Sequence, residues 1–474
     1  MIRKSDSETI APYLIDASNY SGGSAEEVII PENSAELIEF LKNNDSPITI
    51  AGAGTGVSAG RIPDAGRIIS LEKFNKIGKH DQDSICVEAA VSLKQLHEHL
   101  LDDGNWFYPP NPTETLAWIG GTLATNASGS RSYKWGATRE FVQSVDLVFV
   151  DGATLSLSRG TSINEPLKLD DGKTLNFPQV DYVSPKCKNA AGYFIQPDMD
   201  WLDLFIGSDG TLAIILQASL RLLPRPSDFI SGVLFFSDEK ACWNLVPMIR
   251  DSNKQSIAPC ALEYFDSNSL KRLRGTYSNI PERAQSALFF EQDIYQNDDY
   301  DEILQCWFEF LSEQEVSLDD SWFAQNSRDL ERFHEFRHRL PVLINEENSR
   351  RGRVKIGTDL AVPDAYFLPM MEFYQKCLSD SGMDFVMFGH MGDNHLHINL
   401  LPESHQIEEA QGLYSQLVDQ IIKWGGTVSA EHGIGKLKRQ YFAQMVGDNS
   451  LIQLRKIKSM MDPKCLLGRG TLFN

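Results

Sequence analysis

The sequence lacks most of the features that mark secreted, membrane-spanning or cluster-binding proteins. Its seven cysteines stand singly and no C-x-x-C pair occurs, which excludes a zinc ribbon or a cysteine-ligated iron–sulfur cluster. Their odd number and wide scatter predict reduced thiols and a cytoplasmic location. No apolar run reaches the roughly 18 residues of a membrane-spanning helix. Because the N-terminus turns acidic by Asp6, we expect no signal or transit peptide.

Basic residues are outnumbered by acidic ones. The chain has 44 Lys and Arg against 65 Asp and Glu, which gives a formal net charge of -21. An acidic protein is repelled by nucleic acid and by anionic membranes, so we expect neither as a partner. Hydrophobic residues make up 42% of the chain, as in ordinary globular proteins. At 474 residues the chain is too long for one core, and it predicts two domains.

Short strands alternate with helices through the first half of the chain. The predicted elements are strands at 27–31, 47–51 and 67–71, helices at 34–42 and 92–101, and a strand hairpin at 140–152. The polar stretch 159–185 predicts a long excursion. Two prolines after a strand mark a candidate domain boundary at 220–226. Beyond it, helices are predicted near 300–312, 364–380 and 406–424.

Three segments rich in glycine and other small residues follow one another: 52–60, 119–129 and 206–212. Glycine exposes backbone N–H groups and adopts positive φ, so such segments can hold phosphate or a flat ligand against the backbone. The first segment matches a relaxed dinucleotide fingerprint, but Pro63 and Gly66 leave no room for the helix that this fingerprint must open. One such segment alone would be a glycine turn. Three of them predict a large cofactor.

Histidines and acids gather in two short segments near the C-terminus, 389–399 and 425–433. The alternation of polar and apolar residues at 395–400 predicts a β-strand with His395 and His397 on one face. Histidines at i and i+2 on a strand can share one metal ion, and a solvent-facing polar edge is the alternative. With the glutamate and histidine of the second segment, this cluster predicts a divalent-metal site or a proton-transfer site.

In their order along the chain, these segments resemble the vanillyl-alcohol oxidase/p-cresol methylhydroxylase superfamily of flavoproteins. The glycine segments are similar to its FAD-binding domain. The histidine segments are similar to its FAD-linked dehydrogenases of D-lactate, glycolate and D-2-hydroxyglutarate. The resemblance implies an α+β fold. Its parts are a two-subdomain FAD-binding domain at 1–225, a substrate (cap) domain with an antiparallel sheet at 226–440, and a C-terminal segment at 441–474 that returns to the FAD-binding domain.

By this resemblance the first glycine segment holds the FAD pyrophosphate, the second the ribityl and isoalloxazine region, and the third the adenine side. Some relatives attach the flavin covalently through a histidine in the first segment. This chain has Thr55 and no histidine there, so we expect non-covalent FAD. The expected FAD-binding residues are Gly52, Ala53, Gly54, Thr55, Gly56, Ser58, Pro109, Gly120, Gly121, Thr125, Asn126, Gly129, Trp135, Gly136, Gly207, Ser208, Gly210 and Ile214.

The family pattern Gly-His-x-Gly-Asp-Gly-Asn-Leu-His implies one divalent metal ion, Zn²⁺ or Mn²⁺. Its expected ligands are His390, His397 and Glu431. His432 corresponds to the catalytic base. Where the pattern has Gly-Asn, this chain has Asn394 and His395. The added imidazole could join the metal, replace a ligand or contact the substrate, and the sequence leaves these three roles open.

The substrate carboxylate requires a cation. Arg337 matches a family arginine, and its planar fork suits bidentate contact with a carboxylate. Its basic neighbours are equally typical of a solvated helix face. Lys355 and Asn399 resemble substrate-contacting residues of the family.

The activity that the resemblance implies is oxidation of a small D-2-hydroxy acid to the 2-oxo acid, with hydride transfer to flavin N5. The electrons would pass to a separate acceptor: a quinone, an electron-transfer flavoprotein or a partner subunit. Two alternatives stay open at this point. One is metal-independent flavin oxidation of a phenol or sugar, and the other is a flavoprotein without catalytic activity.

Overall fold

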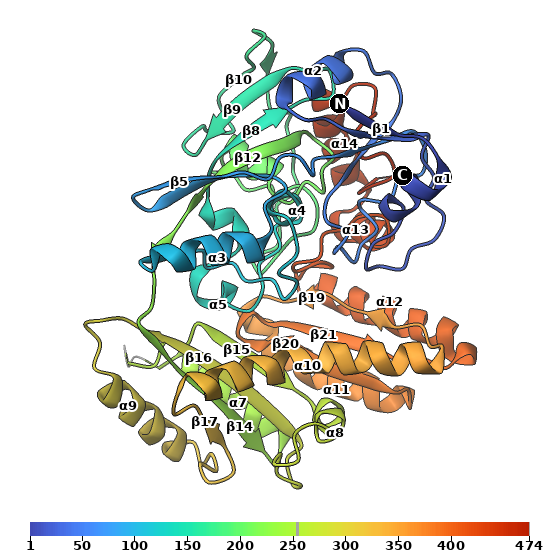
Figure 1. Ribbon diagram of the computed structural model, residues 1–474. Helices are drawn as coiled ribbons and strands as arrows, with labels where there is room; N and C mark the ends of the chain where they lie inside the picture. Colours follow the sequence, from blue (N-terminus) through green and yellow to red (C-terminus); the bar gives the residue numbers. More distant parts are fainter. Residues whose placement is uncertain (253–255, 474) are drawn as a thin grey trace.

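A computed structural model describes residues 1–252 and 256–473 as two lobes stacked one above the other (Figure 1). The upper lobe contains both chain termini, and the lower lobe is built on one large antiparallel sheet. This mixture of helices and antiparallel sheets confirms the predicted α+β fold class. No helix in the described residues is long and apolar enough to cross a bilayer.

The first sheet of the upper lobe comes from the N-terminal part of the chain. Its strands are β1 (Ile2–Lys4), β2 (Glu27–Ile30), β4 (Arg67–Ser70) and β3 (Ile48–Ala51), in that order. Strands β2 and β3 both run parallel to β4. Helix α2 (Ser34–Lys42) has the predicted bounds, but its N-cap is Asn33, whose side chain accepts a hydrogen bond from the Glu36 N–H.

The second sheet of the upper lobe is antiparallel throughout. Its order is β5 (Ile77–Asp81), β6 (Ser84–Glu88), β12 (Ile214–Arg221), β8 (Val142–Val148) and β9 (Thr154–Ser158). Strand β8 lies within the hairpin predicted at 140–152, but its partner β9 follows the turn and lies beyond the predicted bounds. Helix α3 (Leu93–Asp103) begins with a capping box between Ser92 and Gln95. Within the second glycine segment, residues 119–125 form the short helix α4 (Ile119–Thr125).

The lower lobe holds an eight-stranded sheet. Its strands, in order, are β17 (Trp322–Phe323), β14 (Asp228–Phe236), β16 (Ser286–Ile294), β15 (Ala261–Phe265), β20 (Phe385–His390), β21 (His395–Leu400) and β18 (Ile356–Gly357), with β19 (Leu360–Ala361) also paired to β21. Around it lie helices α7 (Glu239–Arg250), α8 (Ser267–Leu273), α9 (Tyr300–Glu313), α10 (Ser327–Arg351), α11 (Phe367–Ser381) and α12 (Ile407–Lys423). Helices α9, α11 and α12 are the three that the sequence predicts.

The chain leaves the lower lobe after α12 and ends in the upper one. Helices α13 (Arg439–Val446) and α14 (Asp448–Met461) lie in the upper lobe (Figure 1). Leu467 bridges to Ile48 of β3, and the buried Lys458 ammonium donates to the carbonyls of Thr211 and Leu467. The exact domain limits at 225 and 440 stay predictions.

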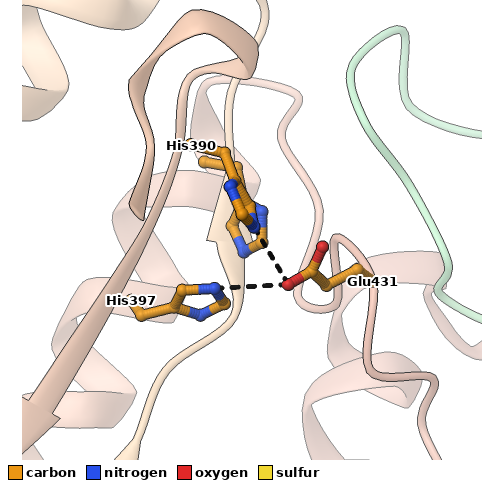
Figure 2. A group of neighbouring side chains, drawn as sticks. His390, His397 and Glu431 are labelled. Carbon is orange, nitrogen blue, oxygen red and sulfur yellow. Dashed lines mark hydrogen bonds and ion pairs between the residues drawn. The ribbon is translucent and has the colours of Figure 1, made fainter. Parts of the chain in front are cut away.

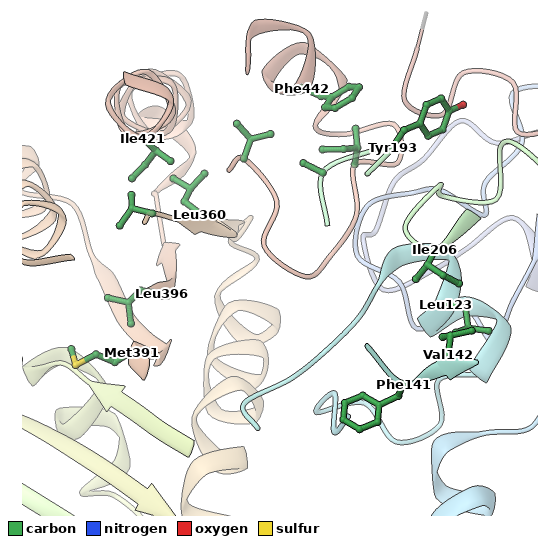
Figure 3. Packing of buried hydrophobic residues seen from close by; sticks show 14 of the residues in the cluster. Leu123, Phe141, Val142, Tyr193, Ile206, Leu360, Met391, Leu396, Ile421 and Phe442 are labelled. Carbon is green, nitrogen blue, oxygen red and sulfur yellow. The ribbon is translucent and has the colours of Figure 1, made fainter. Parts of the chain in front are cut away.

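One apolar core continues through both lobes (Figure 3). It joins Leu123 and Phe141 of the upper lobe to Met391 and Leu396 of the lower one. Polar contacts add to this interface. Arg131 donates to Glu291 of β16 through two bonds of 3.0 Å, and Lys134 of α5 (Ser132–Trp135) lies 2.5 Å from Asp293. The lobes are therefore held together both by packing and by buried charge.

Candidate active site

A cavity of about 1810 Å³ is lined by both lobes. All three glycine segments contribute to its upper wall. The predicted FAD-binding residues that line it are Gly52, Ala53, Gly54, Thr55, Gly56, Ser58, Gly120, Gly121, Thr125, Ser208, Gly210 and Ile214. All seven predicted metal-binding and catalytic residues line the same cavity: Arg337, Lys355, His390, His397, Asn399, Glu431 and His432.

The glycine wall fits a large flat cofactor. A Cβ added at Gly52, Gly56, Gly121 or Gly210 would meet no atom within 4 Å, so at these positions the backbone faces open space. Gly54 has a φ of +86°, a conformation that glycine adopts without strain. The bare backbone therefore leaves room for FAD, whose ring and phosphates could approach the main chain closely.

The other six predicted FAD-binding residues are not among those that line the cavity. Pro109 is buried, and Trp135 packs edge-on against Phe107 just before Gly136. Asn126 ends α4 with a φ of +50°, and its side chain bonds to the backbone of Asn189 and Arg139. Gly207 packs against Arg139 and Asn126, and the Gly129 N–H donates to Glu431. Their assignment to FAD binding stays a prediction.

The three predicted metal ligands converge (Figure 2). Strands β20 and β21 form a hairpin that places His390 and His397 side by side, and Glu431 approaches from the connection between α12 and α13. The Nε2 atoms of His390 and His397 lie 3.2 and 3.3 Å from Glu431 Oε1. Ligands bonded at about 2.1 Å to one ion have such spacings, so two imidazoles and a carboxylate fit a divalent transition metal.

Neighbouring groups fix how each ligand points. Glu263 of β15 lies 2.6 Å from His390 Nδ1, which leaves Nε2 for a metal ion. Glu431 Oε2 accepts from the Gly129 N–H at 3.2 Å and lies 3.0 Å from Lys188 Nζ, which leaves Oε1 facing the two histidines. Burial alone would raise the pKa of Glu431, but Lys188 and His390 hold it well below its usual range.

Asp359 organises the loop that carries Glu431 and His432. This carboxylate is fully buried and accepts the backbone N–H groups of both residues, at 3.2 and 3.0 Å. It also accepts from Ser429 and from Lys438, each at 2.7 Å. Burial alone would raise the pKa of Asp359, but His432 and Lys438 hold it well below its usual range. Asp359 is therefore an anion that fixes the loop.

His432 lies beside the cluster and is held by Asp359. Its Nδ1 lies 3.5 Å from Asp359 Oδ2, and its ring stacks on His397 with centroids 5.3 Å apart. Burial outweighs the opposing effect of Asp359 and lowers the pKa of His432 to about 4. The imidazole is thus neutral at neutral pH, and Nε2 is the nitrogen left to accept a proton.

Arg337 is the predicted carboxylate-binding residue, and it lines the cavity. Among the described residues no carboxylate pairs with it: its guanidinium donates to the Ser130 hydroxyl and lies 2.9 Å from His338 Nε2. Lys355 donates to Asn345 at 3.2 Å, and burial lowers the pKa of its ammonium. Asn399 is buried on β21. Arg337 therefore lines the cavity without a carboxylate in direct contact, although its charge also acts on the nearby Glu263.

Sequence reasoning missed Asp359, Glu263 and Lys188, which hold the predicted residues in place. Glu263 had a usable signal, because a lone acid inside the otherwise apolar stretch 261–265 predicts a buried pairing. Asp359 and Lys188 carry no comparable local pattern. Their roles depend on partners far away in the chain.

Two family descriptions match this chain: "FAD binding domain" at residues 25–158 and "FAD linked oxidases, C-terminal domain" at residues 225–472. Among curated proteins it is similar to a D-lactate dehydrogenase of Archaeoglobus fulgidus, with 26% identity over 94% of this chain and 90% of that protein. It is also similar to glycolate oxidase subunit GlcD of Bacillus subtilis, with 24% identity over 97% of this chain and 92% of that protein. A D-2-hydroxyglutarate dehydrogenase of Stutzerimonas stutzeri is 22% identical over 99% of this chain and 95% of that protein.

The fold is shared with a solved structure of alkyldihydroxyacetonephosphate synthase. The TM-score is 0.70 at 15% identity, and the match covers 98% of this chain and 81% of that one. The larger family match spans residues 225–472, more than half of the chain, and the FAD-binding match precedes it in the same order. The chain belongs to the FAD-linked oxidases and is an FAD-dependent oxidoreductase.

Proposed function

We propose that this protein oxidises a D-2-hydroxy acid to the 2-oxo acid, with non-covalent FAD and one divalent metal ion. One observation carries the proposal. A single cavity joins the glycine wall, the His390–His397–Glu431 cluster and Arg337, which among the described residues has no carboxylate within ion-pair distance. A metal-independent oxidation of a phenol or sugar would need neither the cluster nor the arginine. The three named groups of relatives act, by their names, on lactate, glycolate and 2-hydroxyglutarate.

Each residue has a defined part in this proposal. Arg337 binds the substrate carboxylate and orients the molecule, while Lys355 and Asn399 contact it from the same side of the cavity. His432 takes the hydroxyl proton at Nε2, and Asp359 holds the ring by its Nδ1 side. The His390–His397–Glu431 cluster would hold a metal ion that lowers the pKa of the substrate hydroxyl, and FAD held at the glycine wall would supply the hydride acceptor. An acceptor outside the chain then takes the electrons.

The test is anaerobic reduction of the purified flavoprotein by separate D- and L-2-hydroxy acids. We expect D-lactate, glycolate or D-2-hydroxyglutarate to bleach the flavin absorbance, and a chelator to abolish the bleaching. Arg337→Met should raise KM by more than about tenfold through loss of a charge-assisted contact. Arg339→Met is the matched control, since Arg339 lies on the same helix, pairs with Glu346 and does not line the cavity.

Two outcomes would contradict the proposal. Bleaching by a phenol or sugar that survives chelation would favour metal-independent oxidation. A flavoprotein that no 2-hydroxy acid reduces would favour a chain without this catalytic activity.

A further inference from the structure

His395 is a buried imidazole at the metal cluster. It stands on β21 two residues before His397, where the family pattern described above has asparagine, and its side chain has no exposed surface. Its ring centroid lies 4.5 Å from that of His397 and 5.2 Å from that of His390. One of its ring nitrogens lies within 4.8 Å of donor atoms of His390, His397 and Glu431. These four residues form the largest such group in the described chain.

The two nitrogens of this ring are poorly satisfied. Among the described residues neither has an aligned hydrogen-bond partner, although Nε2 lies 2.9 Å from Asp359 Oδ1. A buried polar atom without a partner is unfavourable, and such atoms in proteins call for a ligand or another explanation.

The pairing of His395 with Asp359 repeats the arrangement around His390. There, Glu263 lies 2.6 Å from Nδ1 and leaves the other ring nitrogen for the ion. Metal-binding histidines commonly direct their second nitrogen at a carboxylate in this way. His395 does not line the cavity, so contact with the substrate has no support. It also has no ligand to replace, since His390 and His397 already converge on Glu431.

We infer that His395 is a fourth protein donor to the divalent ion, beside His390, His397 and Glu431. The inference rests on the proposed metal dependence. Three imidazoles and one carboxylate leave two positions on a six-coordinate ion, as many as a chelating hydroxy acid would fill. Four protein donors would close a tetrahedral Zn²⁺ site, because catalytic zinc keeps one position open. The site therefore favours a six-coordinate ion such as Mn²⁺, Fe²⁺ or Co²⁺.

The decisive measurement counts imidazoles on the ion. The full-length flavoprotein is stripped with chelator, loaded with one equivalent of Co²⁺ and studied by X-ray absorption and visible spectroscopy. We expect three coordinated imidazoles and the weak visible bands of six-coordinate cobalt. Two imidazoles would overturn the inference and leave the proposed function standing. Failure of the protein to bind Co²⁺, Mn²⁺ or Zn²⁺ would overturn the metal dependence and the inference together.

Variants give an independent reading. His395→Asn, which restores the residue of the family pattern, should remove one imidazole from the cobalt spectrum and weaken Co²⁺ binding by more than about tenfold. His395→Gln should do the same. The matched control is His405→Asn, because His405 is exposed; it should change neither the number of coordinated imidazoles nor the affinity for Co²⁺. Unchanged cobalt spectra in both His395 variants, with flavin content intact, would contradict a role as ligand. If neither variant folds, the imidazole count of the unmodified protein still decides.

Discussion

Replacing Asp359 by asparagine should destabilise the protein far more than the same change at a surface aspartate. Asp359 is fully buried and its oxygens accept from Lys438, Ser429 and the backbone of the catalytic loop. Asparagine keeps the shape but turns one acceptor into an N–H₂ donor that must face another donor. It also leaves the Lys438 ammonium, whose side chain is 9% exposed, without its counter-charge.

Removing one partner of a buried ion pair costs about 3–5 kcal/mol, which is a large part of the stability of a typical protein. The assay is guanidinium denaturation followed by tryptophan fluorescence, in which the midpoint of Asp359→Asn should fall clearly. Adding Lys438→Met should recover part of the loss, because the second change removes the unpaired ammonium.

The matched control is Asp45→Asn. Asp45 pairs with Lys464 at 2.6 Å, close to the 2.7 Å of the buried pair, but their side chains are 85% and 69% exposed. We expect the midpoint of this variant to equal that of the unmodified protein. Equal midpoints for Asp359→Asn and Asp45→Asn would refute the reasoning, because burial is the main difference between the two pairs.

Three further predictions concern the cofactor and the metal. Gly435→Ala should yield protein with little flavin, because the new Cβ would collide with the Ser58 carbonyl and Gly435 has a φ of +53°. The measurement is the ratio of flavin absorbance at about 450 nm to protein absorbance at about 280 nm. Gly412→Ala, where a Cβ meets nothing within 4 Å, should retain its flavin. Glu263→Gln should weaken metal binding by about 10- to 100-fold in a competition titration, since His390 loses its carboxylate partner; unchanged affinity would contradict that role. Chelation should abolish turnover and leave the flavin bound, and readdition of Mn²⁺ should restore turnover; activity that survives complete metal removal would contradict a catalytic metal.

Local patterns in the sequence predicted a large part of the cluster. The alternation at 395–400 predicted strand β21, and the family resemblance grouped His390, His397 and Glu431, which lie together in the structure. Periodicity also predicted helices α9, α11 and α12. These features depend on residues close together in the chain or on long motifs.

Contacts between distant segments could not be predicted in this way. His390 meets Glu263 across 127 positions, and Glu431 meets Asp359 across 72. The full length of α10 was also missed, since Pro341 lies inside it and its surface is mostly charged. Pro109 and Trp135 carry the family pattern but are not among the residues that line the cavity, and likeness to a motif does not say which way a side chain faces.

The short stretch 129–134 of the upper lobe has a consequence for chimaeric proteins. Besides the Arg131 and Lys134 ion pairs, the Gly129 N–H donates to Glu431, the Ser130 hydroxyl accepts from Arg337, and Ser132 donates to Asp393. If the substrate lobe were exchanged for that of a relative, these five residues would lose their matched partners. To transfer substrate specificity from one protein of this family to another, the lower lobe and the 129–134 stretch should both be exchanged. Exchanging either one alone should give a flavoprotein with a misaligned site.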